Sequence, residues 1–126
     1  MALVLIRRRW RRNEEYISLS GAHRRILLFK RVYELMRDRL GDDFQFVQLL
    51  VDKRSKNRFW MRPSNEDGMP IGRTGKNKIV TVTPLLEALD WTMQETVRAP
   101  VSWDGKNKAF LVDLKKATKV KGSGPS

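Results

Sequence analysis

Residues 25–41 read RILLFKRVYELMRDRLG, and the spacing of apolar side chains in this stretch changes at Phe29. The first part, Arg25–Leu28, is short and apolar, which is typical of a buried strand. From Phe29 to Arg39 the apolar side chains recur at i, i+3, i+4 and i+7, the spacing of one helix face. Gly41 is a residue type that commonly ends helices. The stretch therefore predicts a strand that leads directly into an amphipathic helix.

Further strands are expected on both sides of this stretch. Tyr16–Ser20 alternates between apolar and polar residues and stops at Gly21, as a strand before a break does. After the helix, Phe44–Val51 is apolar apart from two glutamines and predicts a buried strand. The polar stretch 52–58 predicts a turn, and Phe59–Arg62 predicts the partner strand of a hairpin.

The second half of the chain repeats this order of strand, helix and hairpin. Lys78–Val82 is β-branched, Thr83 and Pro84 suit a helix start, and Pro100–Trp103 and Ala109–Leu114 flank an Asp-Gly turn. A shift of 53 positions, with small gaps in the hairpin, aligns Ile26 with Ile79, Phe29 with Val82, Val32 with Leu85, Glu34 with Glu87, Met36 with Leu89, Asp52 with Asp104 and Phe59 with Phe110. Either half alone is too small to bury its hairpin, so the halves should pack together or with a second chain, which allows a homodimer.

We therefore expect an α+β, mainly β fold in which two βαββ-like units pack into one small barrel-like core. The expected divisions of the chain are a basic N-terminal arm or strand at 1–15, a first βαββ-like unit at 16–63, a linker or loop at 64–77, a second βαββ-like unit at 78–114 and a flexible basic tail at 115–126.

Composition excludes several classes of site. The 126 residues include no cysteine and one histidine, His23, so disulfides and the usual zinc ligand sets are excluded, and His23 is expected to be a turn residue. No cofactor and no enzymatic activity are expected. The longest apolar run, Met1–Ile6, is far shorter than the ~20 residues of a membrane span. It also precedes the arginines instead of following them, unlike a secretory signal. The absence of cysteine fits a reducing cytosol, so a cytoplasmic protein is expected.

The net charge of +12, from 26 basic and 14 acidic residues, points to a polyanionic partner. The densest cluster comprises Arg7, Arg8, Arg9, Arg11 and Arg12, with Trp10 among them as a residue that could stack on a base. We expect this run to contact nucleic acid, DNA in preference to RNA, although a solvated chain end or a charged sheet edge has the same composition. Smaller clusters are Arg24 and Arg25 with Lys30 and Arg31, and Lys115, Lys116, Lys119 and Lys121 in the tail.

The stretches 25–36, 46–52 and 59–63 together resemble the AbrB/SpoVT swapped-hairpin DNA-binding domain. In that family a Gly-Arg-Ile/Val strand leads into a short helix and then a hairpin, and interlocking hairpins, usually from two chains, form a small β-barrel. Two such units in one chain would resemble the tandem arrangement of MraZ proteins. The resemblance implies a transcription-regulator-like DNA-binding protein in which Arg24 and Arg25 contact DNA. The chain departs from the pattern at Phe29, where the family has proline, and at Gly21, which is displaced from the expected glycine position.

Particular residues of the chain also suggest other functions. An assembly module that binds an acidic protein would use the same arginines. A Mg²⁺-dependent nuclease would need two carboxylates and a lysine, for which Asp104, Asp113 and Lys115 are the candidates. The stretch Gly72–Lys76 suggests a phosphate loop but lacks its spacing, so it is expected to be a basic loop with only a secondary chance of touching phosphate. The remaining tryptophans, Trp60, Trp91 and Trp103, are expected to be core or dimer contacts.

Overall fold

Nine strands, two α-helices and one short 3₁₀-helix form the part of the chain that the structure, a computed structural model, describes: residues 15–74 and 77–119. In chain order the elements are β1 (Tyr16–Ser20), β2 (Arg25–Leu28), α2 (Lys30–Leu40), β3 (Phe46–Val51), β4 (Arg58–Ser64), β5 (Met69–Thr74), β6 (Asn77–Thr81), α3 (Thr83–Ala88), β7 (Thr96–Asp104), β8 (Ala109–Asp113), η1 (Leu114–Lys116) and β9 (Thr118–Lys119).

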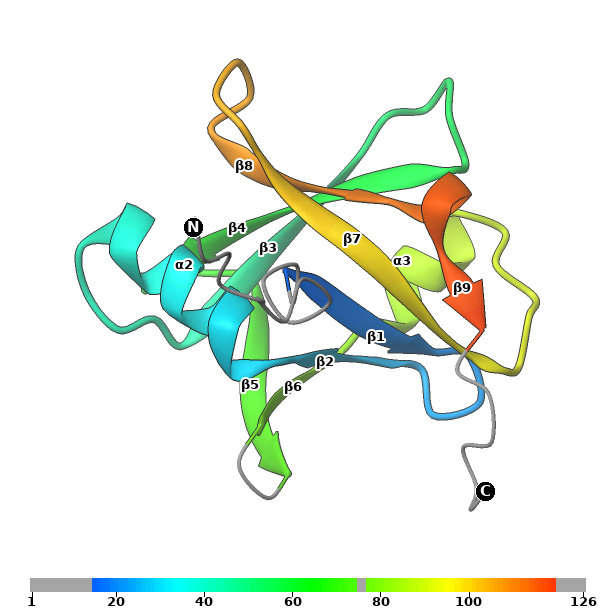
Figure 1. Ribbon diagram of the computed structural model, residues 1–126, viewed down its shortest axis with the longest axis horizontal. Coiled ribbons are helices and arrows are strands. Elements are labelled where there is room, and N and C mark those ends of the chain that lie inside the picture. Colours follow the sequence, from blue (N-terminus) through cyan, green and yellow to red (C-terminus); the bar gives the residue numbers. More distant parts are fainter. Residues whose placement is uncertain (1–14, 75–76, 120–126) are drawn as a thin grey trace, which may run out of the picture.

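The strands close into a barrel (Figure 1). Their order is β1-β2-β6-β5-β3-β4-β8-β7, and β7 pairs in turn with β1, so the ring contains eight strands. Every pairing is antiparallel. The long strand β7 makes the closure possible, because its first half pairs with β1 and its second half pairs with β8. The expectation of a mainly β protein with a small barrel-like core is therefore confirmed.

The two α-helices leave the barrel at opposite ends. Strands β2 and β6 are antiparallel partners, with Leu28 opposite Lys78 and Arg25 opposite Thr81, so the chain exits β2 at one end and β6 at the other. Helix α2 follows β2 and buries Val32 and Met36, whereas α3 follows β6 and buries Leu85 and Leu86. Figure 1 shows α2 and α3 on opposite sides of the barrel. Each helix thus covers apolar core that the strands leave open at that end.

The core is apolar and draws on both halves of the chain. Alternate residues of each strand point inward, as the two-residue period of a strand requires. The largest fully buried side chains are Phe59, Ile17, Leu19, Ile26, Leu28, Met36, Met61, Val32, Val47, Val80, Val82 and Val112. Because these residues form one cluster, the two halves share a single core.

The structure corrects two of the expected divisions. The expected loop at 64–77 contains strand β5, which pairs with β3 and β6. Gly68 lies directly before this strand, at a position where a side chain is disfavoured. Its φ is 130°, and a Cβ there would lie 2.8 Å from the carbonyl oxygen of Val47. The expected flexible tail begins in η1 and β9, and β9 pairs with β7 while Lys119 forms an ion pair with Glu95 at 3.7 Å. None of the helices within 15–74 and 77–119 is long and apolar enough to cross a membrane.

Candidate functional site

Strand β4 carries a tryptophan between two arginines on the outer surface of the barrel. Phe59 and Met61 are fully buried in the core, so the alternating residues Arg58, Trp60 and Arg62 face outward. The neighbouring strands extend this surface in register. Leu50 of β3 and Leu111 of β8 lie opposite Trp60, Gln48 lies opposite Arg62, and Asp113 lies opposite Arg58.

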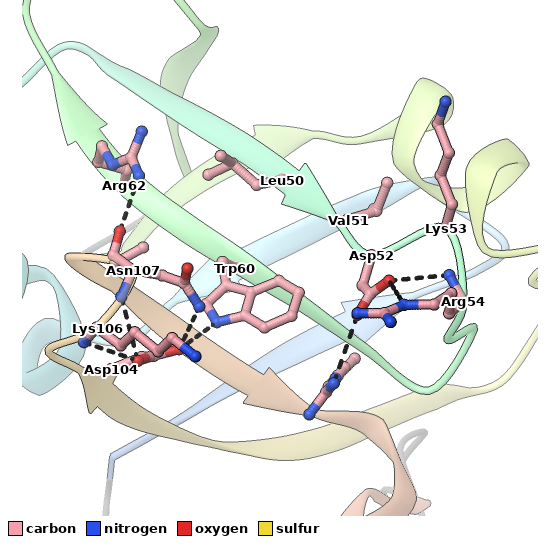
Figure 2. Close-up of a pocket in the computed structure, with 12 residues that line it drawn as sticks. Leu50, Val51, Asp52, Lys53, Arg54, Trp60, Arg62, Asp104, Lys106 and Asn107 are labelled. Atoms are coloured by element: carbon pink, nitrogen blue, oxygen red, sulfur yellow. Dashed lines mark hydrogen bonds and ion pairs between the residues drawn. The ribbon is translucent and has the colours of Figure 1, made fainter.

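Two hairpin turns lie on either side of Trp60 and border an open pocket of about 730 Å³. We call it the hairpin pocket. Figure 2 shows Trp60 between Asp52 and Arg54 of the β3–β4 turn on one side and Asp104 and Asn107 of the β7–β8 turn on the other. The lining residues are Leu50, Val51, Asp52, Lys53, Arg54, Arg58, Trp60, Arg62, Asp104, Lys106, Asn107 and Ala109. Five of them are cationic and two are acidic, so the pocket carries a net charge of +3.

Asp52 is held at one end of the hairpin pocket by the arginines that follow it. Its carboxylate accepts a hydrogen bond from the backbone N–H of Arg54 at 2.9 Å and lies 3.5 Å from the guanidinium groups of both Arg54 and Arg58. The backbone hydrogen bond from Arg54 is the largest cause that lowers the pKa of Asp52; desolvation opposes it, and the charge and side-chain hydrogen bond of Arg54 and the charge of Arg58 lower the pKa further. Asp52 therefore stays ionised and orders the turn.

Asp104 has the equivalent position at the other end. Its carboxylate accepts hydrogen bonds from the side chain of Asn107 at 2.8 Å, from the indole N–H of Trp60 at 2.9 Å and from the backbone N–H of Lys106 at 3.1 Å. The hydrogen bonds from Asn107 and Trp60 are the largest causes that lower the pKa of Asp104. Trp60 is thereby tied to the β7–β8 turn, and the Arg58 guanidinium lies over its ring at 5.3 Å from the centroid.

The remaining cations of the hairpin pocket have neutral partners or none among the residues at 15–74 and 77–119. Arg62 donates hydrogen bonds to the backbone carbonyls of Asn107 at 2.9 Å and Lys108 at 3.3 Å, which are neutral acceptors. Among the residues that the structure describes, no ion pair includes Arg62, Lys53 or Lys106. Since both carboxylates are already engaged, the pocket presents positive charge to an incoming anion.

The hydrogen bonds of Asp104 predict a pH-dependent contribution to stability. A folded-state pKa below the ordinary value of 3.8 means that the ionised carboxylate stabilises the fold above pH 3.8. That stability is lost as the pH falls through the lower folded-state pKa. We expect Asp104→Asn to lower the melting temperature at pH 6, by an amount that stays constant down to about pH 4 and then shrinks toward pH 2. Thermal unfolding across this range checks it, with Asp38→Asn on the exposed face of α2 as control. A difference that does not change with pH would contradict the role given to this carboxylate.

Of the arginines selected from the sequence, the structure describes Arg24 and Arg25. Arg7, Arg8, Arg9, Arg11 and Arg12, together with Trp10, fall outside the described residues. Arg24 lies in the exposed turn before β2, and Arg25 is the first residue of β2. Strand β2 is four strands from β4 in either direction around the barrel, so Arg24 and Arg25 lie on the wall opposite the hairpin pocket. The structure does not bring them together with Arg58 and Arg62.

The three tryptophans expected in the core or at a dimer contact differ in their surroundings. Trp91 and Trp103 are partly buried and pack against the core, and Trp103 meets the ring of Phe110 edge-on at 5.1 Å. Trp60 instead faces outward in the hairpin pocket. It is only 9% exposed, and the Arg58 guanidinium lies over its ring. The Trp60 ring therefore packs beneath a cationic side chain and is not exposed for stacking on nucleic-acid bases.

The residues considered for metal chemistry are also separated. Asp104 pairs with Ala109 at the start of β8, whereas Asp113 ends that strand, about 13 Å further along at the usual rise per residue. Carboxylates that share one Mg²⁺ both lie about 2.1 Å from it. Asp113 instead accepts a hydrogen bond from the backbone N–H of Lys115 at 3.0 Å and caps η1. No group of three metal-ligating side chains occurs among the residues at 15–74 and 77–119.

The sequence did not lead us to predict the hairpin pocket, although one sequence pattern indicated part of it. Alternation in 58–62 places Arg58, Trp60 and Arg62 on one face of a strand. The proximity of the β7–β8 turn follows only from the pairing of β4 with β8. No known family model, curated protein or solved structure matches the chain, so its function is inferred from the geometry of this pocket.

Proposed function

We propose that this protein is a nucleic-acid-binding protein and that the hairpin pocket contacts the phosphate backbone. The observation that carries the proposal is the charge of the pocket, in which five cationic side chains accompany two carboxylates that are already hydrogen-bonded. Phosphates of a nucleic acid lie at high density along the strand, and cations that neutralise them release condensed counterions. Backbone contacts of this kind position a protein on nucleic acid without reading its sequence.

The turns that frame the pocket suit such contacts because they are ordered before a ligand arrives. Asp52 and Asp104 each accept a backbone hydrogen bond from the residue two positions later, which fixes the shape of both turns. Lys53 and Lys106, the exposed residues that follow these aspartates, are therefore held at opposite ends of the pocket. A surface ordered in advance loses less conformational entropy on binding.

The N-terminal arginines extend this proposal. Arg7–Arg12 precede Glu15, where the described part of the chain begins, so they are tethered to the barrel at a known place. The backbone carbonyl of Glu15 accepts a hydrogen bond from Val101 of β7 at 2.8 Å, and its carboxylate pairs with Arg31 at 3.5 Å. Five arginines on such an arm add phosphate contacts to those of the barrel.

We also propose that the two halves are equivalent units of a tandem swapped-hairpin barrel of the AbrB/SpoVT kind. The strand order supports this. If β1 is exchanged with β5, β2 with β6, β3 with β7 and β4 with β8, every strand of the closed ring pairs with the same neighbours as before. Each half also has the order strand, strand, helix, strand, strand, so each unit has one strand more at its start than the expected βαββ pattern. This likeness favours DNA as the nucleic acid to test first.

The proposal is tested by measuring affinity for duplex DNA against salt. Fluorescence anisotropy with a labelled duplex should show an affinity that falls as salt rises from about 50 to 300 mM. The log–log slope should lie near −0.9 for each phosphate neutralised, or roughly −3 to −5 for the hairpin pocket alone. A flat slope, or no binding at about 50 mM salt, would overturn the proposal. Tighter binding to poly-glutamate than to DNA would reassign the pocket to an acidic protein partner.

A further inference from the structure

A second cationic pocket lies between α2 and the β5–β6 hairpin. Lys30, Tyr33, Glu34 and Arg37 recur at i, i+3, i+4 and i+7 and so share one face of α2. Together with residues of the facing hairpin they enclose about 490 Å³. We call this the helix pocket, and its lining residues are Leu28, Lys30, Tyr33, Glu34, Arg37, Arg73, Asn77 and Lys78. It shares no residue with the hairpin pocket.

Positive charge predominates in the helix pocket as well. Of its described lining side chains, four are cationic and Glu34 is the one carboxylate, which gives them a net charge of +3. Arg37 lies 3.9 Å from Asp43, at the outer limit of an ion pair. Within the described ranges, no ion pair includes Lys30, Arg73 or Lys78. Cations of three elements, α2, β5 and β6, thus converge on one cavity that has a single described carboxylate.

Tyr33 holds one of these cations in place. Its ring stacks on Phe44, with centroids 4.6 Å apart and an interplanar angle of 26°. The ammonium group of Lys78 lies over the ring, 5.1 Å from the centroid. Lys78 is only partly exposed, so its position is restricted before any ligand binds. The conformational entropy that Lys78 would lose on binding an anion is therefore smaller.

We propose that the helix pocket is a phosphate-binding site distinct from the hairpin pocket. Lys30, Arg37, Arg73 and Lys78 supply the positive charge, and the side-chain amide of Asn77 supplies a neutral hydrogen-bond donor. The phosphate can belong to a small oligophosphate or to the backbone of a nucleic-acid strand, because both present the same tetrahedral anion. The site does not depend on nucleic-acid binding by the hairpin pocket.

The test follows backbone amide signals in ¹⁵N-correlated NMR spectra while pyrophosphate is added. We expect saturable shifts of the signals of α2 and the β5–β6 hairpin, with a binding constant that can be fitted separately from any shifts at the hairpin pocket. Arg73→Gln, at an exposed position, should weaken pyrophosphate binding about threefold, because an exposed ion pair contributes less than ~1 kcal/mol. Lys115→Gln, at an exposed position that lines neither pocket, removes the same charge and should leave the binding constant unchanged. Equal effects of the two variants, or shifts spread over all basic residues without saturation, would overturn the proposal.

A second titration identifies the source of the phosphate. A six-nucleotide single-stranded oligonucleotide replaces pyrophosphate in the same experiment. Saturable shifts of the helix-pocket signals with both probes support a backbone phosphate, and saturable shifts with pyrophosphate alone support a small oligophosphate. If neither probe shifts these signals, the helix pocket is not a phosphate site. That result would leave DNA binding by the hairpin pocket unaffected, since anisotropy with duplex DNA measures it separately.

Discussion

Charge reversal of Lys53 and Lys106 is expected to lower the affinity for duplex DNA on the order of 100-fold at about 50 mM salt. These two lysines lie at opposite ends of the hairpin pocket and form no ion pair within the described part of the chain. Each lost phosphate contact removes one released counterion, which at this salt concentration corresponds to about a tenfold change in affinity. The log–log salt slope of the Lys53→Glu/Lys106→Glu variant should therefore become shallower by about 2.

A charge-matched control variant on the opposite side of the barrel tests whether the loss of affinity is specific to the hairpin pocket. Arg24→Glu/Arg25→Glu changes the net charge by the same amount but alters residues four strands away from β4. Its effect on DNA affinity should be much smaller, limited to the screened long-range repulsion that both variants share. If this variant instead causes the larger loss, the interface lies on the β2 wall, where the sequence resemblance places it.

Gly21→Ala is expected to destabilise the fold on the order of 3 kcal/mol, which corresponds to about 10 °C in melting temperature for a domain of this size. Gly21 begins the β1–β2 turn, and a Cβ at this position would overlap the backbone carbonyl oxygen of Met93. Ala22 donates a hydrogen bond to the carbonyl of Gln94 at 3.1 Å, so the two segments cannot separate without losing that contact. Thermal and urea unfolding measure the change.

Gly105→Ala is the matched control for this substitution. Gly105 lies in the exposed β7–β8 turn, and its nearest neighbour, the indole nitrogen of Trp103, would be 3.5 Å from the new Cβ. This is an ordinary van der Waals distance, so stability should change by less than about 1 kcal/mol. Similar losses in the two variants would show that the approach of Gly21 to Met93 is not what limits substitution.

Local pattern predicted most individual elements of the fold. Tyr16–Ser20 was expected as a strand and is β1, and the helix expected from Phe29 to Arg39 is observed one residue later, at Lys30–Leu40. Both depend on contacts near in sequence, including the left-handed conformation of Gly41 that ends α2. Such features are visible in a window of a few residues.

Elements that depend on distant partners were missed or shortened. Strand β5 contains Pro70 and Gly72 and follows Gly68, residue types that are typical of loops, yet pairing with β3 and β6 holds it extended. Strand β7 begins at Thr96, four residues before the expected Pro100, because its first half pairs with β1. The hairpin pocket was missed for the same reason, since it forms only where β4 pairs with β8.

The closure of the barrel also bears on how the chain folds. The β1–β7 ladder joins Tyr16 to Pro100, 84 positions apart, so a large loop must close before this pairing contributes any stability. Folding rates fall as contacts become more distant in sequence, and we expect slow folding for a protein of this length. During synthesis, β1 emerges from the ribosome long before its partner β7. Until then its apolar residues Ile17 and Leu19 lack their final environment, and we expect the incomplete chain to be more prone to aggregation than the closed barrel.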